Sequence, residues 1–297
     1  PHRPAQQARG SWSLPMMRAL YTALLTLFCS GAAFADTPDY PAVTLDGTEQ
    51  WLMHNAAGTP YRIMVSLPEG DLPWTGVRSV LYVLDANAYF PGFHAAKRGQ
   101  KAFRQSIIIG IAYPGSDPLN FLRRSYDFSP PAPAGLNEPP QGGQDELLDF
   151  IEQQLMPAVA ERFSIDPHQQ SLFGHSFGGM FALYTLFTRP SLFDHLVAAS
   201  PSQWWSDRFL LQHERDFTQQ VQAQPGLVTH SSLALISAER DAAATREDAR
   251  ALAARLQPLS IHGLRVSEQV IDGEDHMSLP YRIPSLVLEQ VFSNRRR

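Results

Sequence analysis

The chain has 297 residues, of which 44% are hydrophobic and 18% charged, with a formal net charge of −5. This length and composition are typical of one globular domain and leave little room for a second. The acidic balance makes nucleic acid an unexpected partner.

The first element in chain order is a targeting segment over residues 17–35. It begins with Arg18, continues through an apolar run and ends in Ala-Phe-Ala, which predicts a signal peptide cleaved before Asp36. Residues 1–15 are polar and are expected to be a disordered upstream extension. The apolar run is shorter than the ~20 residues of a spanning helix. The alternative to a cleaved signal peptide is that the segment stays uncleaved and associates weakly with the membrane.

This segment predicts an exported, periplasmic protein whose single catalytic domain spans residues 36–297. Cys29, the only cysteine, falls inside the segment, so the mature chain can use neither a disulfide nor a cysteine nucleophile. Removal of residues 1–35 takes away three arginines and no acid, which moves the formal charge from −5 to −8.

Short apolar runs that alternate with helical patterns predict an α/β fold. Strands are expected at 62–67, 80–84, 106–111, 171–173, 196–199, 233–236 and 264–271, and helices at 145–163, 248–256 and 285–292. Several of these strands are apolar nearly throughout, as buried parallel strands are. The alternation predicts a mostly parallel central sheet flanked by helices on both faces.

Two stretches between these elements stand out by composition. Residues 94–124 carry six cationic side chains against one acid, including both lysines of the chain. Residues 128–143 are rich in proline and glycine and predict a long loop, which we expect to border an active-site cleft. A solvated surface insertion is the alternative for this loop.

The sequence Gly-His-Ser-Phe-Gly-Gly at 174–179 places Ser176 between an apolar strand and a segment compatible with a helix. A serine hydroxyl attacks an acyl carbon when it projects from such a sharp turn beside free backbone N–H groups. The glycines on either side permit the bend. A plain glycine-rich turn is the alternative, and the context of strand and helix favours a nucleophile.

A serine nucleophile needs an imidazole base and a carboxylate that orients it, in the chain order Ser, acid, His. His276 follows the last predicted strand and precedes the C-terminal helix, so it is the predicted base. Asp241 follows the strand at 233–236 and is the predicted acid, with Glu239 as the alternative. A Ser/His pair oriented locally by Glu274 or Asp275 is also conceivable.

The oxyanion hole requires two backbone N–H donors. Phe177 is the first, and Asn87, in the turn Leu-Asp-Ala-Asn after the strand at 80–84, is the second. The alternative for this turn is that its polar residues only form the bend. No group of His, Cys, Asp or Glu has convincing metal-ligand spacing, and no phosphate-binding motif is present. We therefore expect no cofactor.

These motifs together resemble the esterase branch of the α/β hydrolases, and within it the trilactone catecholate siderophore esterases. The resemblance runs from about Tyr61 to Ser293 and includes Leu-Asp-Ala-Asn-Ala at 84–88, Arg-Arg-Ser-Tyr-Asp-Phe-Ser-Pro at 123–130 and Ser-Pro-Ser-Gln-Trp-Trp at 200–205. Ala86 stands where the family often has glycine.

The resemblance implies the α/β-hydrolase fold and hydrolysis of the serine esters of a ferric or iron-free siderophore such as enterobactin, which aids iron release. A ferric tris-catecholate is anionic and aromatic, so Arg123, Arg124, Trp204 and Trp205 are the expected substrate-binding residues. The alternative is that the tryptophans belong to the core and the arginines pair with local acids. Competing functions are a general acyl esterase resembling S-formylglutathione hydrolase and a non-catalytic siderophore-binding protein.

Overall fold

The computed structural model describes residues 41–70 and 76–293. Backbone contacts group Leu45–Arg297 into one compact unit, and Pro41–Thr44, the described end of another unit, form neither helix nor strand. The expected signal peptide and upstream extension lie outside the described residues.

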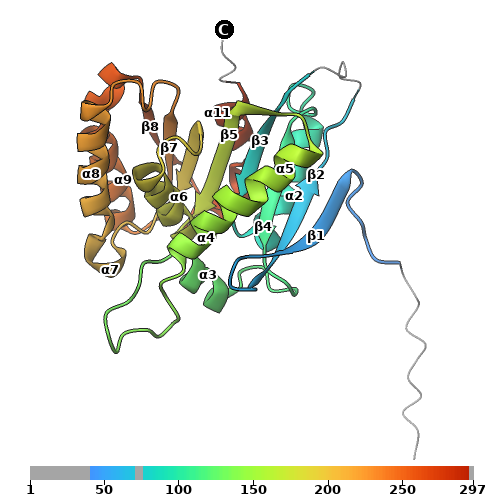
Figure 1. Ribbon diagram of the computed structural model, residues 1–297, viewed down its shortest axis with the longest axis horizontal. Helices are drawn as coiled ribbons and strands as arrows, with labels where there is room; N and C mark the ends of the chain where they lie inside the picture. The colour runs from blue at the N-terminus through green and yellow to red at the C-terminus, as the bar shows by residue number, and fades with distance from the viewer. Residues whose placement is uncertain (1–40, 71–75, 294–297) are drawn as a thin grey trace, which may run out of the picture. The chain divides into compact units, whose positions relative to one another are not determined.

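An eight-stranded sheet forms the centre of the described unit, in the order β1-β2-β4-β3-β5-β6-β7-β8 (Figure 1). Its strands are β1 (Thr48–His54), β2 (Pro60–Ser66), β3 (Arg78–Val83), β4 (Ile107–Ala112), β5 (Ile165–His175), β6 (His195–Ala199), β7 (Ser232–Ala238) and β8 (Arg265–Ile271). From β4 across to β8 all neighbours are parallel, whereas β2 pairs antiparallel with both β1 and β4. The sheet is therefore mostly parallel, as predicted.

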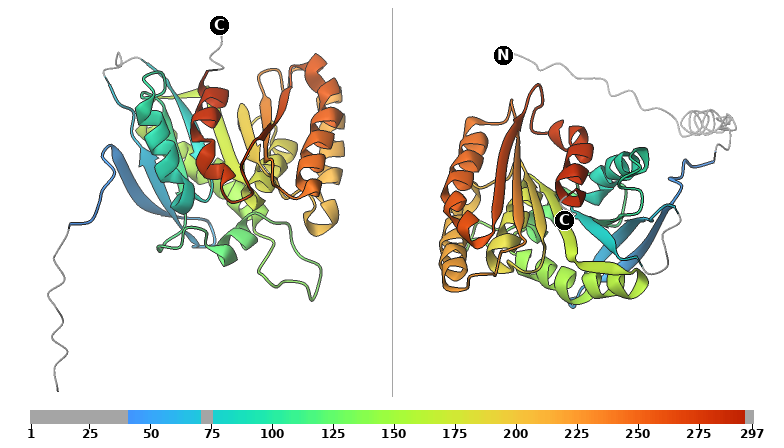
Figure 2. Two further views of the ribbon diagram at one scale, coloured as in Figure 1. Left: turned by 180° about the vertical axis from the view of Figure 1, so that it is seen from behind. Right: turned by 90° about the horizontal axis from the view of Figure 1, so that it is seen from above.

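Helices cover both faces of this sheet (Figure 2). One face carries α2 (Ala86–Gly99) and α11 (Pro284–Phe292). The opposite core includes residues of α4 (Gln144–Phe150), a π-helical segment (Ile151–Leu155), α5 (Met156–Arg162), α6 (Phe177–Thr188), α8 (Leu210–Ala223), α9 (Ala243–Leu256) and the 3-10 segment Gln257–His262. Short helices α3 (Phe121–Asp127), α7 (Trp205–Arg208) and α10 (Leu279–Arg282) lie in the connections.

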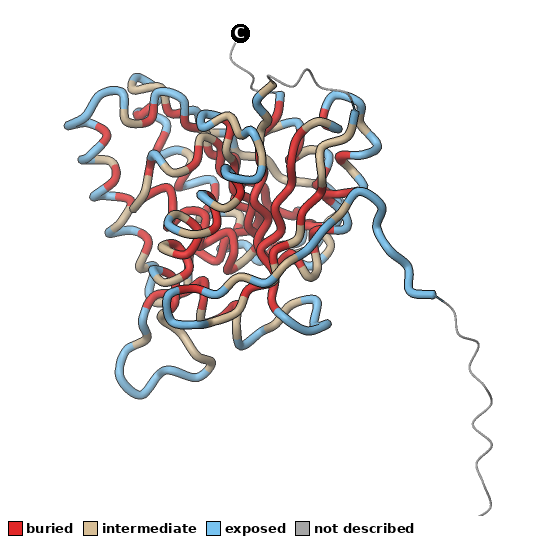
Figure 3. The backbone as a smooth tube through the Cα atoms, turned by 45° about the vertical axis from the view of Figure 1, so that its right-hand side comes forward, coloured by how far each residue is buried: buried red, intermediate tan, exposed pale blue. Residues whose placement is uncertain are grey.

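Two apolar cores lie on the two sides of the sheet because successive residues of a buried strand point to opposite faces. In β3, Leu81 and Val83 belong to the core under α2 and α11, whereas Tyr82 belongs to the core under α6. The central strands are buried along most of their length (Figure 3). This rigid centre fixes the loops at the carboxyl ends of the parallel strands, where ligands bind in α/β folds.

Besides the short helices α3, α7 and α10, three longer elements were not predicted. Strand β1 is half exposed at the edge of the sheet, so its apolar signal is weak. Helix α2 contains Pro91 and two glycines, which disfavour a helix in isolation. Helix α8 buries Leu210, Glu214, Phe217 and Val221 at helical spacing, a signal that the sequence does carry.

Candidate active site

Ser176 lies in a strained turn between the end of β5 and the start of α6. Its backbone has φ 59° and ψ −115°, a conformation that L-residues with a side chain rarely adopt. Such strain persists only where the surrounding structure enforces it. Here the backbone N–H of Ser176 donates to Ala199 O at 2.9 Å, which holds the turn in place. The turn predicted from the sequence is therefore a nucleophile elbow in its geometry.

The glycines around Ser176 allow the backbone of α6 to approach that of β5. A Cβ on Gly174 would lie 2.0 Å from Gly178 O, and one on Gly179 would lie 3.0 Å from Ala199 O. A Cβ on Gly178, by contrast, would have no neighbour closer than 3.5 Å. Gly174 and Gly179 are thus required for close packing, whereas space alone does not require Gly178.

We expect Gly174→Ala to destabilise the protein by about 3 kcal/mol or more, because the backbone of α6 must move to admit the methyl group. Gly178→Ala is the matched control and should change the free energy of unfolding by less than about 1 kcal/mol, since its contacts would be ordinary. Urea unfolding of the two variants measures the difference. Equal destabilisation by both would contradict this account of the turn.

Ser176, His276 and Asp241 form one hydrogen-bonded chain at the carboxyl edge of the sheet. The Ser176 Oγ lies 3.0 Å from His276 Nε2, and His276 Nδ1 lies 2.7 Å from Asp241 Oδ1. Because a carboxylate only accepts, Nδ1 carries the proton and Nε2 is left to accept from the serine hydroxyl. Residues from three different strand ends are thereby brought into the geometry of a Ser-His-Asp triad.

Asp241 is held by two further donors. Its Oδ2 accepts from Ser200 Oγ at 2.5 Å and from the backbone N–H of Ala238 at 2.8 Å. Burial by itself would raise the pKa of Asp241, but the hydrogen bonds from His276, Ser200 and Ala238 outweigh it and lower the pKa below its usual value. Ser200, which directly follows β6, was noted in the sequence only as the first residue of the motif at 200–205 and was given no role.

The alternative carboxylates are engaged elsewhere. Glu239 is exposed and accepts from the backbone N–H of Gly273 at 2.6 Å. Glu274 accepts from Ser278 Oγ, and Asp275 accepts from the backbone N–H groups of Met277 and Ser278. These three acids therefore shape the loop that carries His276 and do not contact its ring in this structure.

His175 is a buried support for the same loop. Its Nε2 lies 2.8 Å from His276 O, and its Nδ1 lies 2.9 Å from the Tyr89 hydroxyl. Nε2 must donate because a carbonyl oxygen only accepts, so the hydroxyl donates to Nδ1. Burial, with smaller effects from His276 and Arg124, lowers the pKa of His175 to about 3. His175 thus supports the loop by a direct hydrogen bond to the backbone of His276.

This low pKa predicts acid sensitivity. The unfolded chain takes up a proton on His175 near pH 6.5 and the folded chain only near pH 3, so stability is lost as the pH falls through that window. Between pH 8 and pH 5 the expected loss from this group is about 2 kcal/mol. His175→Gln should reduce the difference in unfolding free energy between these two pH values by that amount. An unchanged difference, with exposed His230→Gln as control, would contradict the prediction.

Two helix amino termini meet beside Ser176. Phe177 is the first residue of α6 and Asn87 the second residue of α2, and N–H groups in a first helical turn have no acceptor within the helix. The Asn87 side chain fixes its turn, because Oδ1 accepts from Tyr113 N at 2.7 Å and Nδ2 donates to Tyr113 O at 3.1 Å. Both predicted oxyanion donors are therefore available at the edge of the sheet that carries the elbow.

A buried ion pair joins these two turns. Arg124 donates to both carboxylate oxygens of Asp85, at 3.0 and 3.1 Å, and to His175 O at 3.4 Å. Asp85 is the N-cap residue of α2 with φ 52°, and its Oδ2 would lie 3.5 Å from a Cβ on Gly178. Arg124 thus connects the turn of Asn87 to the elbow. Asp85 was expected only to shape its turn, because a partner 39 residues away leaves no local signal.

Both predicted substrate-binding arginines have partners within the protein. Arg124 is only 8% exposed and is bound to Asp85. Arg123 lies 3.7 Å from Asp127, donates to Pro60 O and stacks over the rings of Tyr61 and Tyr113, with centroids 5.0 and 4.8 Å away. The structure thus agrees with the alternative that the arginines pair with local acids, and a contact of either arginine with substrate stays a prediction.

Trp204 and Trp205 line a cavity of about 490 Å³ together with Pro133, Leu136 and Gln141 of the long loop. Trp205 packs edge-on against Phe177, with ring centroids 4.7 Å apart, and donates to Gln141 Oε1. Ser202, three residues earlier, lies 3.3 Å from the Ser176 hydroxyl. The long loop therefore borders a cavity lined by both tryptophans, and Trp205 connects this cavity to Phe177, the residue after Ser176.

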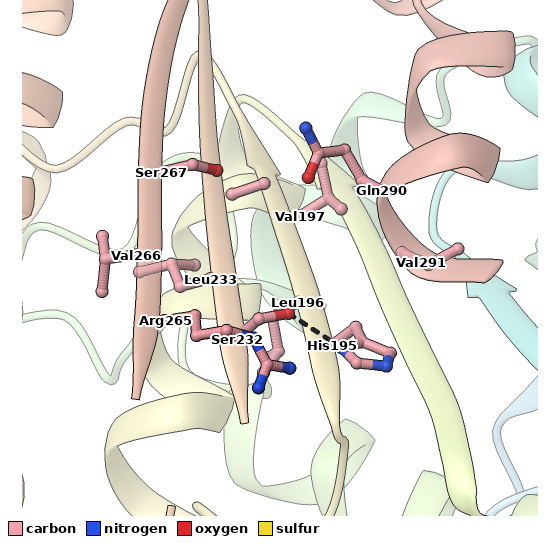
Figure 4. A pocket seen from close by; sticks show the side chains of 11 residues that line it. His195, Leu196, Val197, Ser232, Leu233, Arg265, Val266, Ser267, Gln290 and Val291 are labelled. Carbon is pink, nitrogen blue, oxygen red and sulfur yellow. Dashed lines mark hydrogen bonds between the residues drawn. The ribbon is translucent and has the colours of Figure 1, made fainter. Parts of the chain in front are cut away.

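A second cavity, of about 180 Å³, lies at the amino ends of β6, β7 and β8 (Figure 4). His195, Ser232 and Arg265 begin these strands, so this cavity lies at the edge of the sheet opposite Ser176. Burial lowers the pKa of His195 to about 4, and its Nδ1 lies 2.8 Å from Ser232 Oγ. It is not part of the site around Ser176.

Metal and membrane features are absent from the described part of the chain. Over residues 41–70 and 76–293, no three or more His, Cys, Asp or Glu side chains are grouped to hold a metal ion. In the same ranges, no helix is both long and apolar enough to cross a membrane.

The sheet order, the strained serine turn and the Ser-His-Asp arrangement at strand ends define an α/β hydrolase. Residues 54–277 match the family model described as "Putative esterase", and the chain belongs to this family.

Several members with assigned substrates are similar to this chain. It is 39% identical to a siderophore triacetylfusarinine C esterase of Aspergillus fumigatus over 60% of this chain and 63% of that protein. It is 31% identical to the ferri-bacillibactin esterase of Bacillus subtilis over 83% of this chain and 89% of that protein. The match therefore spans slightly less than two thirds of the first relative and most of the second.

A solved structure supports the assignment of the fold. The BES protein of Bacillus cereus superposes with a TM-score of 0.77 at 30% identity, covering 86% of this chain and 98% of that one. The α/β-hydrolase fold inferred from the sequence is thus confirmed.

Proposed function

We propose that this chain is a serine esterase that hydrolyses the ester bonds of a siderophore and so aids release of its iron. The observation that carries this proposal is the hydrogen-bonded chain from Ser176 Oγ through His276 to Asp241. The two relatives described above are named for siderophore esters, which supports the substrate class. A cyclic catecholate trilactone such as enterobactin is the specific substrate that we propose.

In the proposed reaction, His276 Nε2 removes the hydroxyl proton as Ser176 Oγ attacks the ester carbon. The negative charge that develops on the carbonyl oxygen is stabilised by the backbone N–H groups of Phe177 and Asn87. His276 then gives its proton to the departing alcohol, which leaves an acyl-serine. Water, deprotonated by the same imidazole, hydrolyses this acyl group and restores the free hydroxyl.

The substrate is proposed to lie in the cleft between the long loop and Trp204. This tryptophan is 47% exposed and lies with its ring centroid 5.6 Å from that of Trp205. Exposed aromatic side chains of this kind can pack against the planar rings of a catecholate or the apolar parts of another siderophore.

The test is to incubate the protein with enterobactin, with a p-nitrophenyl ester and with S-formylglutathione, and to identify the products by mass spectrometry. Linear catechoyl-serine products are expected from the first incubation. Cleavage of the simple ester alone would favour a general acyl esterase, and binding of enterobactin without products would favour a non-catalytic binding protein. Either result would overturn the proposal.

We also propose that the protein acts in the periplasm, on the basis of the signal-peptide pattern over residues 17–35. Expression of the whole chain followed by cell fractionation should recover it in the periplasm, with an amino terminus at Asp36. Recovery of the unprocessed chain in the cytoplasm would contradict this.

A further inference from the structure

The cavity lined by Trp204 and Trp205 presents apolar surface and a carboxylate. Leu136 and Trp204 are 65% and 47% exposed, and Pro133 and Trp205 complete its apolar wall. Asp207, which is exposed, is the one charged residue among the described residues that line it. Glu138, also exposed, belongs to the same loop as Leu136. A ligand in this cavity therefore meets negative charge and no lining cation.

Three arginines of the preceding helix and of the cavity's own segment are paired with acids of the protein. Arg124 pairs with Asp85, and Arg123 lies 3.7 Å from Asp127 and also donates to Pro60 O. Arg208 follows Asp207 directly, but its guanidinium pairs with Asp248 at 2.5 Å. Each of these cations thus has an acidic partner that offsets part of its attraction for an anionic ligand.

Two exposed arginines near the loop that carries His276 also have partners within the protein. Arg240 donates to Gly273 O, and Arg282 lies 3.6 Å from Glu274. These two arginines therefore also face carbonyl or carboxylate oxygens of the protein.

The remaining cations of the basic stretch 94–124 lie at the other edge of the sheet. They precede Ile107, the first residue of β4, whereas Ser176 follows the last residue of β5, and both strands run parallel to β3. Lys97 is fully buried and donates to the carbonyl oxygens of Ser66, Leu67 and Ser106. Arg98 pairs with Glu69 at 2.5 Å. The cationic side chains of residues 94–124 thus do not surround the cleft.

A ferric tris-catecholate carries three negative charges, and desolvating them beside an apolar wall is unfavourable unless cations replace the lost water. The same catecholate without iron is uncharged near neutral pH, and so is a ferric trihydroxamate. We infer that this cleft selects siderophore triesters without net charge over trianionic ferric catecholates. The inference rests on the proposed siderophore esterase function, limits efficient iron release to uncharged ferric siderophores, and assigns Asp207 as a specificity residue.

Three substrates test the inference: iron-free enterobactin, ferric enterobactin and ferric triacetylfusarinine C. The two forms of enterobactin share one ester skeleton and differ in iron and in charge. Ferric triacetylfusarinine C contains iron but is uncharged, so it distinguishes an effect of charge from an effect of iron. We expect kcat/KM for ferric enterobactin to be about tenfold or more below that for either uncharged substrate, with the gap narrowing as salt is added.

Variants at Asp207 measure how much its charge contributes to this selectivity. Asp207 has φ 53°, which asparagine tolerates well, so Asp207→Asn should fold. It should raise the ratio of kcat/KM for ferric over iron-free enterobactin about threefold, and Asp207→Lys should raise it about tenfold. Asp216→Asn, at an exposed carboxylate of α8, is the matched control and should leave the ratio unchanged.

Faster cleavage of ferric enterobactin than of both uncharged substrates would overturn the inference while leaving the esterase function intact. An unchanged ratio in both Asp207 variants would overturn the role of that residue. Absence of triester cleavage together with turnover of a p-nitrophenyl ester would overturn the proposed function itself, and the inference with it.

Discussion

Ser176→Ala should lower kcat/KM for ester hydrolysis by about 10⁵-fold, because no other group can form the acyl intermediate at this position. Its hydroxyl is the one that lies 3.0 Å from His276 Nε2 at the strained turn. The residual rate would come from the oxyanion donors and from substrate positioning alone. Initial rates with iron-free enterobactin and with a p-nitrophenyl ester provide the measurement.

Ser202→Ala is the matched control for this variant. Its hydroxyl lies 3.3 Å from that of Ser176 but is not among the hydrogen-bond partners of His276. We expect a loss of no more than about tenfold, since one neutral hydrogen bond contributes about 1 kcal/mol. The Ser176→Ala protein should still bind the siderophore, as followed by tryptophan fluorescence. Equal losses in the two serine variants would remove the case for Ser176 as the nucleophile.

The sequence predicted the parts of this site that depend on local pattern and chain order. Strand, turn and helix around Ser176 follow from a short apolar run and closely spaced glycines. His276 and Asp241 follow from their places after late strands, because parallel strands bring their carboxyl ends to one edge. The structure brings these three side chains into contact as the order of the motifs implies.

The sequence could not predict where buried charge is neutralised. Arg124 and Asp85 are 39 residues apart and meet only after α2 and α3 have packed at the edge of the sheet. The charge count over 94–124 was correct, but it does not show which edge of the sheet each cation occupies. Lys97 is the clearest case, since it is buried against backbone carbonyl groups far along the strands from Ser176.

Helix α2 was missed because tertiary contacts outweigh its local preference. Pro91 and Gly92 disfavour a helix by propensity, but Phe90 and Phe93 are buried against the sheet. Gly92 also lies close to Pro284 of α11, which a Cβ would contact at 3.6 Å. The second predicted oxyanion donor, Asn87, therefore sits at the start of a helix that only the folded core reveals.

Asp241→Asn should lower kcat by about 10⁴-fold while leaving the fold intact, because an amide can present its NH₂ to His276 Nδ1 and so favour the wrong tautomer. The proton would then sit on Nε2, which could no longer accept from Ser176. The low pKa of Asp241 keeps its carboxylate ionised even as the pH falls below the usual aspartate range. In the wild-type protein, His276 should therefore keep its proton on Nδ1 at neutral pH. Steady-state rates at neutral pH measure the difference.

Two further variants rank the supports of His276. Glu239→Gln removes the alternative carboxylate, which binds Gly273 N and not the imidazole, so we expect less than about a tenfold loss. Ser200→Ala removes one of the two donors to Asp241 Oδ2 and should give an intermediate loss of about tenfold to a hundredfold, since hydrogen bonds to charged groups contribute about 1.5–3 kcal/mol. A Glu239 variant as impaired as Asp241→Asn would reassign the acid. Near-wild-type activity in Asp241→Asn would instead indicate a Ser/His pair that works without a third member.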